Sequence, residues 1–238
     1  MTPGCAAAGR ISPVVRNWTS VGESVGVTVQ TGGMPASEMS VVSVTEFETV
    51  IGRCAMAWTD SGVVRFQLPD VVRTGSAKGP RDAVAPDFSP ITADMLRRGV
   101  DSIPPERVRQ TEPDGAMATA VDAIRAHLTG ELDDLRWIPV DYRAQPEFHR
   151  AVYDITRAID PGHTLTYGEV AARTGTPGAA QAVGQALGRN PIPLIVPCHR
   201  VLAADHGLHG FSAPGGVATK ARLLEIERTS GFGEPTLF

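Results

Sequence analysis

A cysteine and a histidine stand side by side at Cys198 and His199, in an apolar segment that contains three prolines and predicts a strand leading to the cysteine. A histidine beside a thiol can accept its proton or stabilise the thiolate, the form of cysteine that attacks carbon. Neighbouring side chains of a strand point to opposite faces, so His199 reaches the sulfur only where a strand ends or turns, and Pro197 favours such a geometry. Glu227, with Glu225 as second choice, is the candidate carboxylate to orient the imidazole. The alternative interpretation is a buried cysteine beside a surface histidine.

The composition is that of an ordinary globular protein. The 238 residues are 42% apolar and 20% charged, and the net charge of −4 does not by itself indicate a polyanionic partner. No apolar run reaches the length of a membrane span, and the first residues lack the pattern of a secretion signal. Three widely separated cysteines disfavour a disulfide framework and a cysteine-rich zinc site. We therefore expect a cytoplasmic protein that holds no metal or cofactor.

The first half of the chain predicts a small α/β domain at about residues 45–143. Residues 1–44 are rich in Gly, Ser, Thr and Val and are interpreted as a poorly ordered extension. Residues 47–68 predict two short strands around a turn at 59–62. Residues 69–115 predict a long loop with at most one short helix near 92–99. A helix follows, since Met117, Val121, Ile124 and Leu128 recur at helical spacing before Gly130.

The second half predicts a mainly helical domain at about residues 146–230, followed by a tail at 231–238. Apolar residues at helical spacing predict a helix over about 148–159. Two further short helices with a tight turn between them suggest a helix-turn-helix in a winged-helix-like arrangement, and a last helix closes the domain. These three helices are expected at about 167–173, 179–187 and 217–226.

The positive charges of the second half are unevenly distributed. Residues 170–204 contain no acidic residue and three arginines, Arg173, Arg189 and Arg200. A local positive surface is typical of a nucleic-acid contact. Three arginines that merely solvate a small domain explain the charge equally well.

The segment NPIPLIVPCHRVL, residues 190–202, resembles the active-site signature of the O6-alkylguanine-DNA alkyltransferases, also called methylated-DNA–protein-cysteine methyltransferases. FHRAVYDITRAIDPGHTLTYGEVAARTG is similar to the first two helices of the family's second domain. QAVGQALGRNP resembles its recognition helix and hinge, and GFSAPGGVATKARLLEIE its closing loop and helix. FETVIGRCAMAWTDSGVVRFQLP resembles the opening hairpin of its N-terminal domain. The segments occur in the family's order, which makes the resemblance specific.

The resemblance implies catalytic roles for five residues. Cys198 would accept the alkyl group, and His199 would deprotonate it through a water molecule. Glu227 would orient His199, and Asn190 would brace the turn that carries the cysteine. Tyr167 would help to rotate the target nucleotide outward and would protonate the departing guanine, because a neutral leaving group departs more easily than an anion.

The resemblance also implies a substrate pocket and a DNA-binding helix. Phe211 would form an aromatic wall, the Ser212 amide would bond the guanine oxygen, and Lys220 would have a supporting role. Two neighbours of the cysteine complete the predicted pocket, Val196 and Pro197. The predicted DNA contacts are Gln181, Ala182, Gly184, Arg189 and Arg200.

The recognition helix has one departure from the family. Its many small residues fit a minor groove about 6 Å wide, although they equally permit close helix packing. The family usually has an arginine before the AVG of this helix, where it fills the gap left by the flipped base. This chain has Gln181 there, which is shorter, uncharged and a poorer stacking partner.

The function implied is repair of O6-alkylguanine by stoichiometric transfer of the alkyl group to Cys198 after base flipping. The partner would be double-stranded DNA, bound by a monomer without membrane contact. One alternative is a protein that binds the lesion with little or no transfer, which Gln181 keeps open. Another is a helix-turn-helix regulator with Cys198 as a sensor. The regulatory members of the family carry an N-terminal cysteine-rich zinc module and a further DNA-binding module, and neither is visible in this sequence. A cysteine hydrolase has the least support, since nothing suggests an oxyanion hole.

Overall fold

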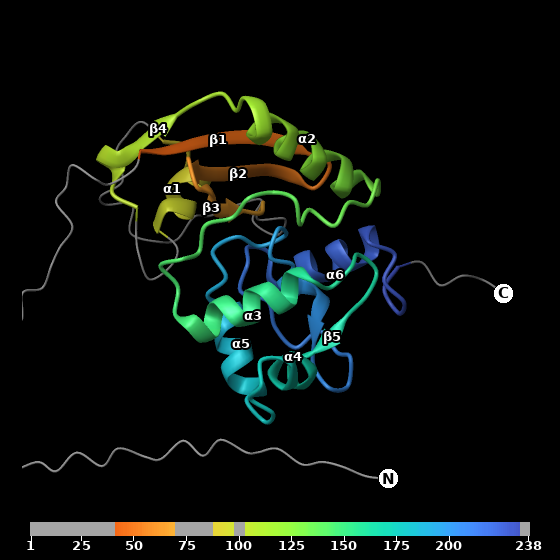
Figure 1. The fold of residues 1–238 in the computed structure, drawn as a ribbon. Helices are drawn as coiled ribbons and strands as arrows, with labels where there is room; N and C mark the ends of the chain where they lie inside the picture. Colours follow the sequence, from red (N-terminus) through yellow and green to blue (C-terminus); the bar gives the residue numbers. More distant parts are fainter. Residues whose placement is uncertain (1–40, 70–87, 98–102, 234–238) are drawn as a thin grey trace, which may run out of the picture. The chain divides into compact units, whose positions relative to one another are not determined.

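The computed structural model describes residues 41–69, 88–97 and 103–233. Its first part is a four-stranded sheet in the order β3-β2-β1-β4 (Figure 1). β1 (Val42–Thr49), β2 (Gly52–Thr59) and β3 (Gly62–Gln67) form an antiparallel meander, and β4 (Val108–Gln110) lies parallel to β1. The predicted hairpin around residues 59–62 is therefore confirmed.

Two helices cover the two faces of the sheet. α1 (Pro90–Arg97) packs on the face that carries Val42, Val44, Ala55 and Ala57. α2 (Gly115–Thr129) packs on the opposite face, which carries the alternate side chains Phe47, Met56 and Trp58, and it ends at the left-handed Gly130 with φ 97°. Both helices were predicted from the sequence.

Two sequence predictions about this part are corrected. β1 begins at Val42, so the last residues of the expected extension 1–44 form a strand. β4 and a short 3₁₀ turn, η2 (Pro105–Arg107), fall within the predicted loop 69–115. The remainder of the extension, residues 70–87 and 98–102 of the loop and residues 234–238 of the tail lie outside the described residues.

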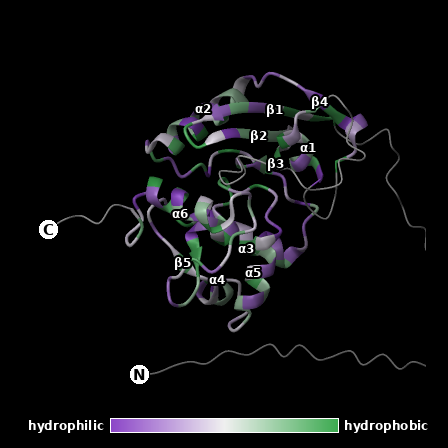
Figure 2. Ribbon diagram, turned by 180° about the vertical axis from the view of Figure 1, so that it is seen from behind, coloured by the Kyte–Doolittle hydropathy of each residue, from purple (hydrophilic) through white to green (hydrophobic). Residues whose placement is uncertain are grey.

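The second part is mainly helical. Its helices are α3 (Glu147–Arg157), α4 (Tyr167–Arg173), α5 (Ala180–Gly188) and α6 (Gly216–Ile226), each within two residues of its predicted start and end. β5 (Leu165–Thr166) and β6 (Val201–Leu202) add a short parallel pair. Figure 2 shows both hydrophobic and hydrophilic residues along the helices, as expected where one face is buried. None of the described helices is long and apolar enough to cross a membrane.

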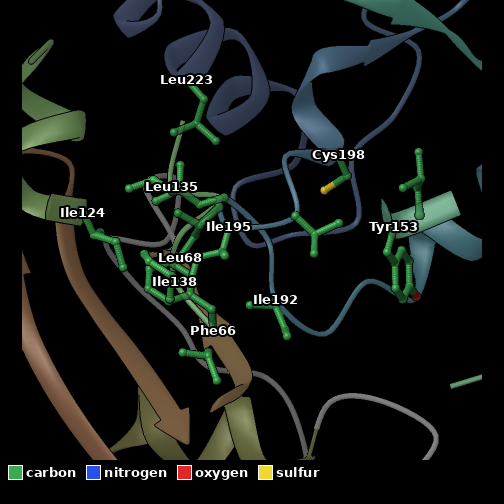
Figure 3. Close-up of a cluster of buried hydrophobic side chains, with 14 of the residues drawn as sticks. Phe66, Leu68, Ile124, Leu135, Ile138, Tyr153, Ile192, Ile195, Cys198 and Leu223 are labelled. Atoms are coloured by element: carbon green, nitrogen blue, oxygen red, sulfur yellow. The ribbon is translucent and has the colours of Figure 1, made fainter. Parts of the chain in front are cut away.

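A continuous buried cluster joins the sheet to the helical part. Phe66 and Leu68 at the end of β3 lie beside Ile192 and Ile195 of the segment that leads to the cysteine (Figure 3). The backbone makes a second link, since the Phe66 N–H donates to the Pro191 carbonyl at 3.0 Å. The segment before the cysteine is thus packed directly against the sheet.

Candidate active site

The segment before Cys198 is an irregular loop, and the prediction of a strand there is wrong. Its prolines remove donors that a strand would use, and the Asn190 side chain supplies the missing bonds. Asn190 Nδ2 donates to the Val196 carbonyl at 2.8 Å, and Asn190 Oδ1 accepts from the Ile192 N–H at 3.0 Å. Leu194 has a φ of 76°, which bends the chain inside this brace. The loop ends in the 3₁₀ turn η3 (Cys198–Arg200), so the chain does turn at the cysteine, as the Cys-His pair requires.

The short parallel pair brings a tyrosine to this turn. β6 directly follows η3, and β5 directly precedes α4, with Leu165 paired to Val201. A capping box fixes the first residue of α4: the Thr166 hydroxyl accepts from the Glu169 N–H at 3.2 Å, and Glu169 Oε2 accepts from the Thr166 N–H at 2.7 Å. Tyr167 follows the cap, half-buried beside the cysteine turn.

Glu227, at the C-terminal end of α6, accepts hydrogen bonds from both residues that follow the cysteine. His199 Nε2 lies 2.9 Å from Glu227 Oε1. Arg200 donates from Nε to Oε2 at 2.9 Å and from Nη2 to Oε1 at 2.7 Å. All three side chains are at most 1% exposed. Glu225, the second choice, instead pairs with Arg222 on the exposed side of the helix at 2.6 Å.

A second histidine reaches the same carboxylate from the other part of the molecule. His127, in the last turn of α2, is fully buried, and its Nε2 lies 3.1 Å from Glu227 Oε1. Its Nδ1 accepts the backbone N–H of Asp133 at 3.2 Å. Sequence reasoning missed this residue. The signal was a histidine three residues after Ile124 on the apolar face of a predicted helix, where a polar ring must find partners.

The protonation of the site follows from burial and these bonds. Burial lowers the pKa of His199, against the opposing effect of the Glu227 carboxylate, so its neutral form is favoured. Burial alone would raise the pKa of Glu227, but the His199, His127 and Arg200 donors hold that pKa far below its usual range. Glu227 is therefore ionised. Since its Oε1 can only accept, His199 carries its hydrogen on Nε2, and Nδ1 has no hydrogen-bond partner among the described residues.

Two groups oppose the cost of burying a thiolate. Burial raises the pKa of Cys198, whereas hydrogen bonding by Asn190 and the charge of Lys220 lower it. Lys220, from α6, is 1% exposed and donates from Nζ to the Val201 carbonyl at 2.7 Å. Its Nζ also lies 5.9 Å from the centre of the Tyr167 ring, within the range of a cation–π contact. The Lys220 ammonium group therefore lies between Tyr167 of α4 and Val201, which follows the cysteine turn.

Cys198 opens into two adjoining hollows, although it is only 8% exposed itself. One hollow, of about 360 Å³, is lined by Tyr167, Gly184, Phe211 and Ser212. The other, of about 310 Å³, extends toward the sheet, with Asn190 and Ser212 in its lining. A planar ring that enters one of these hollows can bring a substituent to Cys198.

The predicted DNA contacts fall into two groups. Gln181 and Arg189 are exposed at the two ends of α5, while Ala182 and Gly184 are half-buried on it. Arg200 is fully buried, with its Nη1 directed to the Ile159 carbonyl at 2.5 Å, so the prediction of a DNA contact at Arg200 is corrected.

The predicted pocket is corrected at two positions. Val196 is fully buried, and neither Val196 nor Pro197 lines either described hollow. The carbonyl oxygens of these two residues hold the turn instead: Val196 accepts from the Cys198 N–H at 2.8 Å, and Pro197 from the Arg200 N–H at 2.9 Å.

Comparisons with known proteins identify the family of the chain. The family model described as 6-O-methylguanine DNA methyltransferase, DNA binding domain, matches residues 147–229. A methylated-DNA–protein-cysteine methyltransferase of Mycobacterium tuberculosis is 41% identical over 143 residues, which are 60% of this chain and 84% of the relative. One from Methanothermobacter thermautotrophicus is 39% identical over 149 residues, covering 60% of this chain and 77% of the relative.

Solved structures show the same fold. The crystal structure of Mycobacterium tuberculosis OGT in complex with DNA matches with a TM-score of 0.56 at 29% identity, covering 79% of this chain and 94% of that chain. The O6-methylguanine-DNA methyltransferase of Pyrococcus kodakaraensis matches with a TM-score of 0.51 at 26% identity, covering 79% of this chain and 99% of that chain.

The fold has a small mixed sheet with helices and then a helical domain, in which the residue after the cysteine is a histidine bonded to a buried glutamate. Together with the related solved structures, this arrangement indicates a cysteine-dependent alkyl transferase. The chain belongs to the methylated-DNA–protein-cysteine methyltransferase family.

Proposed function

We propose that this protein repairs O6-alkylguanine in DNA by transferring the alkyl group to the Cys198 sulfur, once per molecule. The observation that carries the proposal is the position of Cys198: its sulfur opens into both hollows, and the next residue, His199, is held by Glu227 at 2.9 Å. The family relationship supports the reaction type.

The reaction uses a proton relay on each side of the transferred carbon. His199 Nδ1, whose lone pair is not engaged by any described residue, accepts the thiol proton directly or through one water molecule. The thiolate forms the S–C bond as the C–O6 bond breaks, and that electron pair stays with the guanine. Tyr167 donates a proton to the departing base. Burial raises the pKa of Tyr167, so its hydroxyl remains protonated and able to donate at neutral pH. The thioether has no easy hydrolytic route, so the cysteine is spent.

The target base must leave the duplex to reach this site, at a cost of a few kcal/mol. α5 is suited to lie in a minor groove because Ala182, Gly184 and Gly188, which are half-buried or exposed on it, are all small. The flipped guanine occupies the hollow between Tyr167 and Phe211, with the alkyl group directed to the sulfur. That a relative has been solved in complex with DNA supports duplex DNA as the partner.

Intact-mass measurement after incubation with a duplex containing O6-methylguanine tests the proposal. The protein should gain one methyl mass, peptide mapping should place it on Cys198, and Cys198→Ser should abolish the gain. Cys54→Ser is the matched control: Cys54 is also buried, and burial raises the pKa of its thiol to about 12, so it should not react. Binding of the duplex without any mass gain would instead favour a lesion-binding protein.

A further inference from the structure

His127 is held at both nitrogens. The Asp133 N–H, which can only donate, lies 3.2 Å from Nδ1, so Nδ1 carries no hydrogen and Nε2 must carry it. Nε2–H in turn donates to Glu227 Oε1 at 3.1 Å. The ring is therefore a neutral imidazole whose orientation and tautomer are both fixed by its partners.

The oxygen that His127 contacts is the one that His199 uses. Glu227 Oε1 accepts from His127, His199 and Arg200, while Oε2 accepts from Arg200 alone. Arg200 binds the carboxylate from the cysteine turn, and His127 binds it from the last turn of α2. Among the described residues, His127 makes the one side-chain hydrogen bond from the sheet-bearing part to this carboxylate.

Charge neutralisation does not require this histidine. The buried Arg200 already matches the charge of Glu227 in a bidentate pair. The cost of burying the imidazole is offset because both of its nitrogens are bonded, and one of these bonds goes to the carboxylate oxygen that also holds His199. His127 adds a directional hydrogen bond to a carboxylate whose charge Arg200 already balances.

We propose that His127 is a positioning residue for alkyl transfer: its Nε2–H holds the Glu227 carboxylate in the orientation that aligns His199 with the Cys198 thiol. This inference rests on the proposed function and deepens it, because it gives the sheet-bearing part a role in the reactivity of a cysteine located in the helical part. The substrate contacts neither His127 nor Glu227 in this scheme. Loss of His127 should therefore affect the rate of the chemical step and not substrate binding.

The test compares three variants of the full chain in transfer from the free base O6-benzylguanine, which needs no base flipping. In His127→Gln the side-chain amide can still donate to Glu227 and accept from Asp133. The side chain in His127→Asn is one methylene shorter than in His127→Gln, so it can accept from the Asp133 N–H but cannot reach Glu227. The side chain in His127→Phe fills the space and makes neither hydrogen bond. The limiting rate constant should fall about five- to tenfold in the Asn and Phe variants, as for one lost hydrogen bond. The half-saturating concentration should not change, and the Gln variant should stay within about twofold of the wild type.

Leu128→Ala is the matched structural control, because Leu128 is the next residue of α2, is 1% exposed and has an apolar side chain that cannot bond to Glu227. It should lower the thermal unfolding midpoint without slowing transfer at temperatures where the protein is folded. Equal rates for His127→Gln and His127→Asn, or slowing by Leu128→Ala to the same degree, would overturn the positioning role. If His127→Phe fails to fold, the Gln and Asn variants decide the question. A wild-type protein without transfer would contradict the proposed function and the positioning role together, whereas wild-type transfer with unchanged variants would contradict the positioning role alone.

Discussion

Arg200 and Glu227 form a bidentate ion pair that is closed to solvent at both ends. The two side chains are 0% and 1% exposed, and their bonds are 2.9 Å from Nε to Oε2 and 2.7 Å from Nη2 to Oε1. The remaining guanidinium nitrogen, Nη1, donates to the Ile159 carbonyl at 2.5 Å. Arg200 thus links the cysteine turn to the ends of α3 and α6. Its positive charge neutralises the buried carboxylate of Glu227.

Removal of Arg200 should be strongly destabilising, because it leaves the Glu227 charge buried with only neutral donors. Arg200→Ala should lower the free energy of unfolding by about 3–5 kcal/mol, measured by urea unfolding. Arg222→Ala is the control, since the Arg222–Glu225 pair is exposed and such pairs contribute about 1 kcal/mol or less. Comparable losses for the two variants would show that the buried pair is not a principal support of the fold.

Removal of the relay should affect chemistry more than DNA binding. His199→Gln and Glu227→Gln should each slow transfer to Cys198 by about 10²-fold or more, as is typical for a lost general base. Binding of an O6-methylguanine duplex, measured in a Cys198→Ser background so that no protein is consumed, should change by less than about threefold. Either variant reacting with free O6-benzylguanine at the wild-type rate would contradict the relay.

Local sequence patterns were sufficient for the elements whose partners lie close in the chain. The helical spacing of Met117, Val121, Ile124 and Leu128 predicted α2 because its buried face is defined by its own residues. β4 was missed because it has three residues, two of them exposed, and exists through its pairing with β1, more than 60 residues earlier. No pattern within three residues reports such a distant partner.

The sequence pointed to the site residues through the family motif. The corrections concern residues whose environment depends on partners far away in the chain. The run from Ile192 to Val196 is apolar because it is buried, but the Asn190 side chain, and not a neighbouring strand, satisfies its backbone. Arg200 was interpreted as a surface charge because its partner Glu227 is 27 residues away. His127 was missed for the same reason, since 100 residues separate it from that carboxylate.

The buried relay predicts an acid limit for both activity and stability. Because burial lowers the pKa of His199 below about 6.5, its usual value, the base stays neutral and transfer to free O6-benzylguanine should not decline until the pH is below about 6.5. In the unfolded chain this histidine takes up a proton near pH 6.5. The unfolded state therefore binds more protons, and stability should fall as the pH drops below that value.

Glu227 adds a second loss of stability at lower pH. Its pKa is depressed in the folded protein, so the unfolded chain takes up a proton near pH 4.3 while the folded protein does not. Urea unfolding between pH 4 and pH 8 checks whether the free energy of unfolding falls, as expected for both groups, when the pH is lowered. Near pH 6.5 the free energy of unfolding should change less steeply with pH in His199→Gln than in the wild type. An identical pH dependence would mean that His199 is not the group responsible.

Gln181, exposed near the start of α5, should limit the repair of duplex DNA, because the family usually has a stacking arginine at this position. Stacking in a duplex contributes about 1–3 kcal/mol by analogy with aromatic–base stacking, and a positive charge adds a salt-dependent attraction to phosphates. Gln181→Arg should therefore accelerate repair of the O6-methylguanine duplex about fivefold or more and steepen its salt dependence. Reaction with free O6-benzylguanine should be nearly unchanged, since no base has to be held out of a helix.

The matched control is Gln185→Arg, which adds the same charge one helical turn further along the exposed side of α5. It should steepen the salt dependence but accelerate duplex repair much less, because a general attraction to DNA does not fill the gap left by the flipped base. If both variants accelerate duplex repair equally, the added positive charge alone explains the effect of Gln181→Arg. Equal acceleration of Gln181→Arg on duplex and free base would mean that residue 181 perturbs the thiol pocket. No change on the duplex would mean that another exposed residue, such as Arg189 at the opposite end of α5, already fills the gap.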